Sequence, residues 1–288
     1  MKKRKIINTS LALALIIFSC ALVLIPLYFT VLNSFKPYPE IAANIAAFPQ
    51  SPTLDNFKEA WKRLDFLNVL RNTLIITVFS AVGTVVLSGM TGYWLTRHPN
   101  WFTKLCYVLI LCGMSVPFQC IMITFAKMIG LLNMGNRYIG VIMSNWTFSM
   151  PIPVFLVTGA VKTLPLEIEE SAVIDGCTPL NLYWKIVFPL TKGTMFTIVS
   201  LEVLKYWNNY LMTQFILTKQ QMRTIQIAMM SLFNEALFSW DVAVAAVTLS
   251  ILPLFICNCT EAGIKQRDYG SGKGIELSGE KFKFEHSN

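Results

Sequence analysis

Six apolar stretches follow one another along the chain, separated by shorter polar connections. Each reaches the twenty or so residues that an α-helix needs to cross about 30 Å of hydrocarbon at about 1.5 Å per residue. They cover residues 10–32, 70–95, 103–126, 138–161, 187–210 and 242–262. The pattern predicts an all-α integral membrane protein with six transmembrane helices.

The same pattern predicts how the chain is divided. A six-span domain covers residues 10–264, between a short N-terminal segment, 1–9, and a tail, 265–288. The start, "KKRK" followed by an apolar run and "IFSC", imitates a cleavable signal. The apolar run continues past Cys20 as "ALVLIPLYFTVL", so we expect a membrane anchor. Between the first two spans, residues 33–69 read as a surface loop with one amphipathic helical stretch near 55–64.

Basic residues set the predicted orientation. Lys2 to Lys5, the connections 96–104 and 162–186 and the tail fall on one side of the membrane, and all carry lysine or arginine. The positive-inside rule then places both termini in the cytoplasm. Cations on the opposite side are balanced by nearby acids, so the bias rests mainly on the two ends of the chain.

Composition supports the membrane assignment and excludes several kinds of function. The 288 residues are 54% apolar and 14% charged, with a mean hydropathy of +0.54. The net charge of +8 is spread over short connections, as membrane topology requires, so we expect no nucleic-acid partner. The seven cysteines show no metal-ligand spacing, and the two histidines, His98 and His286, lie far apart in sequence. "GSGKG" at 270–274 lacks the first glycine and the hydroxyl of a phosphate-binding loop. We therefore expect no metal, no nucleotide site and no catalytic residues in this chain.

The connection between the fourth and fifth spans carries unusual local signals. Within 164–193 they predict helix, turn, helix: Pro165 and three glutamates suit a helix start, and Asp175-Gly176 suits its end. Thr178 and Pro179 then suit an N-cap and a first helical residue, and the second helix runs until Pro189. An interfacial hairpin with solvated acids fits the pattern, but anionic lipid repels carboxylates. Docking to a basic groove on a cytoplasmic partner explains the acids better.

The spacing of this loop resembles a known motif. Glu170-Ser171-Ala172, three residues, Gly176, nine residues, Ile186, one residue and Phe188-Pro189 resemble the E-A-A-x3-G-x9-I-x-L-P loop. That loop is typical of permease subunits in binding-protein-dependent ABC importers. Further segments are similar to the carbohydrate branch of that family, the maltose and oligosaccharide permeases: "PLYFTVLNSFK", "GLLNMGNRYIGVI", "WNNYL", "TIQIAM" and "QRDYG".

The resemblance implies a function and a set of partners. Loop 162–189, with its hairpin 164–184, would hold a coupling helix that docks into a cleft on an ATPase. The predicted ATPase-coupling residues are Glu169, Glu170, Ser171, Ala172, Asp175 and Gly176. ATP and Mg would be bound by two copies of that separate ATPase, and this chain would have no cofactor of its own. A second homologous permease, most simply in a heterodimer, and an extracytoplasmic solute-binding protein would complete the importer in a bacterial inner membrane.

The resemblance favours a sugar or an oligosaccharide as the solute, but the loop does not distinguish it from a polyamine or an amino acid. An ion-driven secondary transporter is a third hypothesis, disfavoured because no repeat is evident and the spans contain one acid. That acid, Glu202, precedes a polar-aromatic cluster. The predicted solute pathway comprises Glu202, Trp207, Asn208, Asn209 and Tyr210.

Two interpretations of this cluster stay open: a sugar path, or an interfacial aromatic belt with amide capping. Glu202 also has Lys205 three residues on, which suits a structural ion pair. Gln119 and Asn145, in the third and fourth spans, suit interhelical hydrogen bonds.

Overall fold

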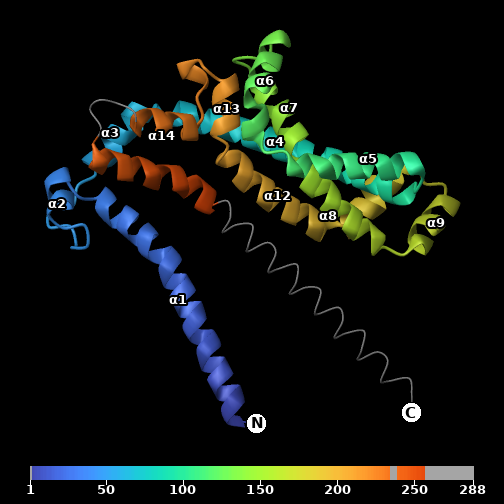
Figure 1. Ribbon diagram of the computed structural model, residues 1–288, viewed down its shortest axis with the longest axis horizontal. Helices are drawn as coiled ribbons and strands as arrows, with labels where there is room; N and C mark the ends of the chain where they lie inside the picture. The colour runs from blue at the N-terminus through green and yellow to red at the C-terminus, as the bar shows by residue number, and fades with distance from the viewer. Residues whose placement is uncertain (1, 234–238, 257–288) are drawn as a thin grey trace. The chain divides into compact units, whose positions relative to one another are not determined.

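The computed structural model describes residues 2–233 and 239–256, and in these ranges the regular structure is helical, with no strand. The chain divides into two compact units: residues 1–67 with 228–255, and residues 68–227. Figure 1 colours the chain from blue at its start to red near its end, so the segments of each unit can be followed by residue number. The predicted tail 265–288, its His286 and the last residues of the sixth predicted span, 257–262, lie outside the described residues.

The first unit holds three N-terminal helices and a late one. They are α1 (Lys2–Ser34), α2 (Tyr38–Ala43), α3 (Asp55–Leu64) and the helix Trp240–Ile256. Helix α3 confirms the predicted amphipathic stretch: it buries Asn56, Ala60 and Leu64, which recur every four residues and so share one face. Asp65 follows it with a left-handed φ of 49°, a conformation common after a helix.

The segment between α1 and α3 is tied together by polar side chains. The buried Lys36 donates from Nζ to the carbonyl oxygens of Asn44 (3.2 Å) and Ile45 (3.1 Å). Asn56 donates to the carbonyls of Ser34 (3.1 Å) and Lys36 (2.7 Å). The predicted surface loop is therefore an ordered fold with defined backbone partners.

The second unit is built from short and long helices around α4. They are α4 (Phe66–Arg97), α5 (Trp101–Cys112), α6 (Phe118–Leu131), α7 (Tyr138–Ser149), α8 (Pro151–Lys162), α9 (Leu166–Ile174), α10 (Pro179–Leu182), α11 (Phe188–Leu190), α12 (Lys192–Trp207) and α13 (Leu211–Ile216). A π-helix, Tyr183–Val187, joins α10 to α11, and single 3₁₀ turns cover Gly113–Ser115 and Gln220–Met222. Helix α4 begins two residues before the second unit, and a further helix, α14 (Ile225–Phe233), begins in the second unit and has its residues 228–233 in the first.

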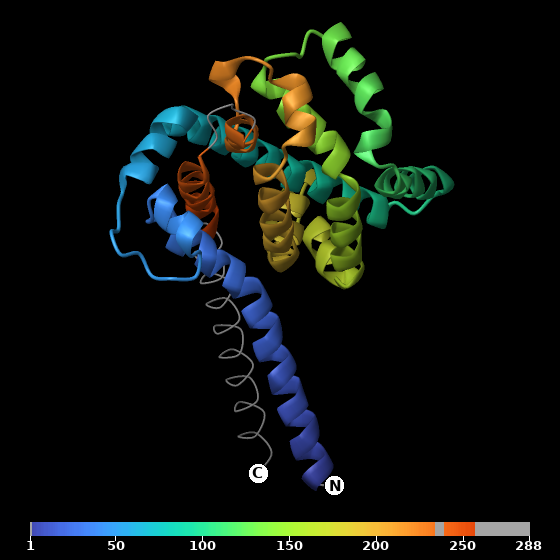
Figure 2. The ribbon, with the colours of Figure 1, turned by 60° about the vertical axis from the view of Figure 1, so that its left-hand side comes forward.

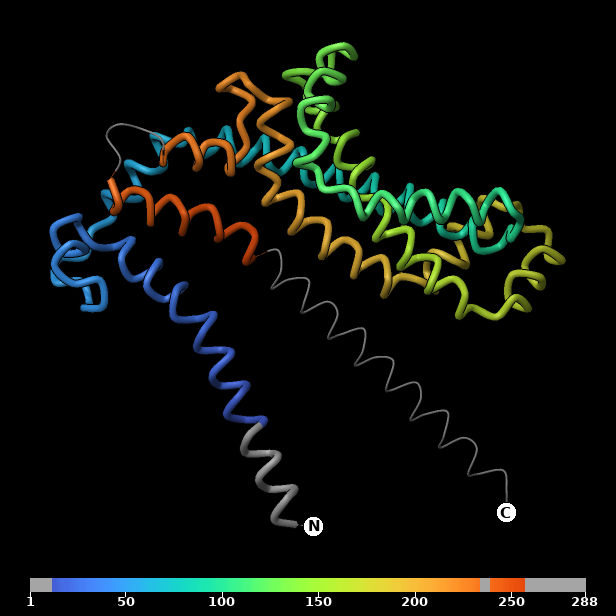
Figure 3. Tube along the Cα trace, viewed as in Figure 1, coloured from blue at the N-terminus to red at the C-terminus, as the bar shows by residue number. Residues whose placement is uncertain are grey.

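Small residues let other side chains approach α4 closely. Figures 1 and 2 show α4 extending along the unit, with α8 and α12 beside each other, and Figure 3 follows the same path as a tube. At Gly92, an added Cβ would lie 2.7 Å from Cγ1 of Val157 in α8, too close for any side chain. The indole of Trp146 in α7 occupies the corresponding space at Gly83 and donates from Nε1 to the carbonyl of Ser80 (3.1 Å).

The predicted spans appear as two kinds of segment. Ala12–Ser34, within α1, and Phe66–Arg97 are long and apolar enough to cross a membrane as single helices. Three further apolar segments are pairs of helices with a bend between them: Trp101–Ser115 with Phe118–Leu131 (105°), Tyr138–Ser149 with Pro151–Lys162 (52°), and Pro179–Leu190 with Lys192–Trp207 (78°). Up to five spans result if each pair counts as one, and Trp240–Ile256 is a shorter apolar helix.

The sequence did not predict the interruptions in the third and fourth spans. Val116 precedes Pro117 and is extended (φ −95°, ψ 108°), as residues before proline commonly are, so α6 starts in a new direction. Pro151, the first residue of α8, lacks the N–H that would continue α7. The predicted fifth span, 187–210, is also interrupted: α11 ends at Leu190, and α12 starts at Lys192 in a direction that differs by 78°.

Candidate functional site

Helix α9 and the turn after it have the local structure that the sequence predicted for 164–193. Pro165 precedes α9, and Asp175 caps its C-terminus. Gly176 has a φ of +83°, the left-handed conformation that glycine adopts without a Cβ penalty. Thr178 accepts a hydrogen bond from the backbone N–H of Asn181 (3.4 Å) at the start of α10, with Pro179 as its first residue. The second helix continues through the π-helix to Leu190.

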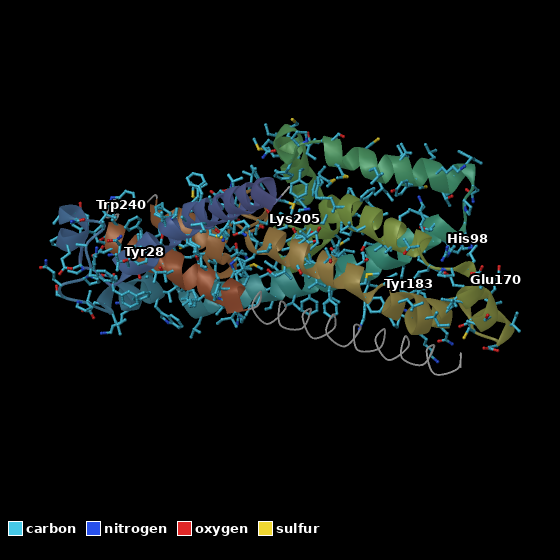
Figure 4. All side chains as sticks on the ribbon, turned by 90° about the horizontal axis from the view of Figure 1, so that it is seen from below. Tyr28, His98, Glu170, Tyr183, Lys205 and Trp240 are labelled. Carbon is cyan, nitrogen blue, oxygen red and sulfur yellow. The ribbon has the colours of Figure 1, made fainter. Side chains whose placement is uncertain are left out.

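The predicted ATPase-coupling residues divide between two sides of this segment. Glu169 and Ala172 are buried against the rest of the unit, whereas Glu170, Ser171, Asp175 and Gly176 are exposed. Figure 4 shows Glu170 at the same end of the unit as His98 and Tyr183. Apolar side chains are exposed beside these polar ones: Ile174 is 85% exposed, Val173 58% and Leu166 52%. An outward surface that mixes carboxylates with large apolar groups is typical of a partner-binding surface.

Glu169 instead makes contacts inside the chain. Its Oε1 accepts hydrogen bonds from Nε (2.8 Å) and Nη2 (2.5 Å) of Arg97, the last residue of α4. Its Oε2 accepts from the hydroxyl of Tyr93 (3.0 Å). The side chains of Arg97 and Glu169 are 12% and 9% exposed, so this is a nearly buried ion pair. It joins the N-terminal part of α9 to the end of the second predicted span.

Sequence reasoning missed Arg97 and Tyr93 as parts of this site. One signal was available: the connections 96–104 and 162–186 were predicted on the same side of the membrane. A cation at the end of one and three glutamates in the other are complementary, and a search for charge pairs between them would have proposed Arg97.

An open cavity of about 410 Å³ lies elsewhere in the second unit, within the size range of small-molecule sites. Its polar lining comes from four elements or connections, while Phe118 and Phe148 contribute aromatic faces. The side chains of Gln119, Asn145, Lys205 and Asn209 form most of that polar lining.

A chain of amide hydrogen bonds orients this lining. Asn209 donates from Nδ2 to Oδ1 of Asn145 (2.9 Å), and Asn145 donates from Nδ2 to the hydroxyl of Ser80 (2.9 Å). These bonds confirm the predicted interhelical role of Asn145, since they link α4, α7 and the residues after α12. They also hold two amides at the cavity wall.

The other four predicted pathway residues do not line the cavity. Glu202 is 2% exposed, and its Oε2 accepts no hydrogen bond among the described residues; it lies 3.9 Å from Nζ of Lys205, a long ion-pair contact. Trp207 is buried. Asn208 is exposed and caps α12 by donating to the carbonyl of Leu204 (2.9 Å), and Tyr210 is half-buried. Of the five residues predicted for the solute pathway, Asn209 thus lines the cavity.

Comparisons with known proteins give a consistent result. Residues 84–258 match the family model described as "Binding-protein-dependent transport system inner membrane component". The chain is 34% identical over 231 residues to AmyC of Thermoanaerobacterium thermosulfurigenes, named a probable starch degradation products transport system permease protein, covering 80% of this chain and 84% of that one. It is 31% identical over 233 residues to MelC of Bacillus subtilis, a melibiose/raffinose/stachyose import permease protein, covering 81% and 84%.

A solved structure shares the fold. A bacterial ABC transporter involved in the import of the acidic polysaccharide alginate superimposes with a TM-score of 0.77 at 19% identity, over 90% of this chain and 96% of the matched one. The arrangement of helices described above is therefore that of a known transporter chain.

Proposed function

The chain belongs to the family of binding-protein-dependent transport system inner membrane components, and on that basis we propose that it forms half of the translocation pathway of an ATP-driven sugar importer. AmyC is named as a probable permease for starch degradation products, and MelC as an import permease for melibiose, raffinose and stachyose. These names favour a sugar or an oligosaccharide over a polyamine or an amino acid as the solute. Membership of this family also disfavours the ion-driven alternative.

The observation that carries the proposal is the outward surface of α9. The exposed Glu170 and Asp175 lie beside exposed apolar residues, and Gly176 fixes the turn that follows. We propose that this surface docks on a cytoplasmic ATPase, which binds ATP and Mg. Closure of two ATPase copies would move α9 and thereby switch access to the pathway between the two sides of the membrane.

The proposal also includes the number of membrane spans, the partner subunits and the path of the sugar. Six spans, counting each bent pair once and Trp240–Ile256 as part of the sixth, would place both termini in the cytoplasm. A second homologous permease would complete the pathway, and an extracytoplasmic solute-binding protein would deliver the sugar. The cavity lined by Asn145 and Asn209 supports a sugar path, because amides bond hydroxyl groups and Phe118 and Phe148 offer faces for C–H surfaces.

Reconstitution of the importer tests this function. With the ATPase, the second permease and the binding protein in proteoliposomes, we expect ATP-dependent uptake of raffinose and none of putrescine. Glu170→Lys reverses a charge on the docking surface, so the ATPase should no longer co-purify and uptake should stop. Glu167→Lys, the same change at an exposed position of α9 outside the predicted coupling residues, serves as the control.

Two results would contradict the proposal. Co-purification of the ATPase with the Glu170→Lys variant at the wild-type yield would remove α9 as the docking element. Uptake of putrescine in preference to raffinose would reject the sugar as cargo while leaving the coupling intact.

A further inference from the structure

The buried ion pair of α9 connects two elements that are far apart in sequence. Arg97 and Glu169 are separated by 72 positions, and no loop leads directly from α9 to α4. The chain instead leads from α8 into α9 through residues 163–165, and from α9 toward α12 through α10, the π-helix and α11. Movement of α9 therefore reaches α8 and α12 along the backbone, but reaches α4 through side chains.

Several hydrogen bonds form the side-chain connection between α9 and α4. The Arg97 guanidinium donates twice to one carboxylate oxygen of Glu169 and donates from Nη2 to the carbonyl of Leu164 (3.2 Å), just before α9. Tyr93, one turn earlier on α4, bonds the other carboxylate oxygen. Both carboxylate oxygens are thus held, and the planar guanidinium restricts the direction of approach.

Its position on α4 also favours the pair. Arg97 ends that helix, where the backbone carbonyls favour a cation. The partly buried surroundings reduce screening by salt, so the attraction persists at physiological ionic strength.

We propose that Arg97 and Glu169 are positioning residues that pass the movement of α9 to α4. This inference rests on the proposed docking of α9 on an ATPase, and it assigns different tasks to two adjacent glutamates. Glu170 contacts the ATPase, whereas Glu169 transmits the resulting movement into the second span. Tyr93 holds the carboxylate in the orientation that Arg97 requires.

Two reporters in the assembled importer distinguish transmission from docking. Met90→Cys reports on α4 and Leu201→Cys on α12, and both positions are exposed. Each is introduced into a chain whose seven native cysteines are replaced by serine. The measurement is the rate of maleimide labelling with and without ATP and vanadate, which trap the closed ATPase.

With the native pair, we expect trapping to change the labelling rate at both reporters. With Arg97→Met or Glu169→Gln, the ATPase should still co-purify and the α12 reporter should still respond. The response of the α4 reporter should fall by about fivefold or more, the scale of a lost coupling between two sites. The charge exchange Arg97→Glu with Glu169→Arg should restore part of it, and Tyr93→Phe should produce a smaller loss.

Glu167→Gln is the matched control, because this exposed glutamate on the same helix should leave both reporters unchanged. An α4 response at the wild-type level in Glu169→Gln would overturn the inference. Loss of the ATPase in Glu169→Gln, as in Glu170→Lys, would overturn it too, since Glu169 would then belong to the docking surface. If neither reporter responds in the native protein, the proposed function itself fails, and the inference with it.

Discussion

At the scale of single residues, Glu40 shows how polar side chains order the segment between α1 and α3. Its carboxylate accepts hydrogen bonds from the hydroxyl of Ser51 and from the backbone N–H groups of Gln50 (3.1 Å) and Ser51 (3.0 Å). The Ser51 hydroxyl is the largest cause that lowers the pKa of Glu40 below its ordinary value of 4.5; desolvation opposes it, and the backbone bonds and Lys36 add to it. The charged form is therefore the one that holds this segment together.

This lowered pKa predicts how the segment responds to acid. Because the pKa of Glu40 is lower when the segment is folded than when it is open, its stabilisation is present above 4.5 and is lost as the pH falls through the folded value. In hydrogen exchange, the protection of residues 38–51 relative to an unstructured chain should fall with a midpoint below pH 4.5. Ser51→Ala should move that midpoint upward, whereas Thr53→Ala, which removes a nearby hydroxyl outside the Glu40 contacts, is the matched control. A midpoint that Ser51→Ala leaves in place would contradict the assigned cause.

Residues of the α9 segment differ in how far local rules predict them. Gly176, Thr178 and Pro179 are governed by neighbours within a few positions, and the structure confirms each as the sequence predicted. Glu169 and Glu170 are chemically identical and adjacent, so composition and spacing assign them one role. The structure separates them because the partner of Glu169 comes from α4, a tertiary contact that helix signals do not encode.

At the scale of elements, the packing of α4 depends on glycines. An added Cβ at Gly92 would press on the fully buried Val157, and one at Gly83 would overlap the indole of Trp146. β-Branched valine has little rotamer freedom to move aside in a helix. We therefore expect Gly92→Ala and Gly83→Ala each to lower the free energy of unfolding by about 1–3 kcal/mol through overpacking.

Unfolding of the purified chain in mixed micelles measures this effect. Gly159→Ala in α8 is the matched control, because nothing lies within 4 Å of its added Cβ. There the free energy of unfolding should stay the same or rise by up to about 1 kcal/mol, since alanine favours a helix over glycine. Equal effects at Gly92 and Gly159 would show that helix propensity, not close packing, determines the role of the α4 glycines.

The elements also show what the length of an apolar run predicts and what it does not: it predicts a helix, but not where that helix is interrupted. Apolar length predicted the unbroken crossings in α1 and α4 to within a few residues, because a run of that length satisfies its backbone only as a helix. The breaks were harder: Pro26 lies inside α1 without ending it, whereas Pro117 and Pro151 start new helices bent by 105° and 52°. Proline removes the same N–H in all three places, so the presence of a proline does not by itself predict where a helix ends.

At the scale of the whole molecule, the proposed function depends on which side of the membrane each connection occupies. With six crossings and cytoplasmic termini, residues 35–65 and 132–137 lie outside the cell, and residues 163–178 lie inside. Only that arrangement lets α9 meet a cytoplasmic ATPase. The basic residues that favour it are concentrated at the two ends of the chain, so the orientation needs a direct measurement.

Single cysteines in a chain without its seven native ones provide that measurement. Ala46→Cys, Leu132→Cys and Glu167→Cys each fall at an exposed position. A membrane-impermeant maleimide should label positions 46 and 132 in intact spheroplasts and position 167 only after permeabilisation. Complete labelling of all three in detergent is the control for reactivity. Labelling of position 167 in intact spheroplasts, with 46 silent, would place α9 outside the cell; the buried pair of Arg97 and Glu169 would then be a structural contact, because no ATPase could move it.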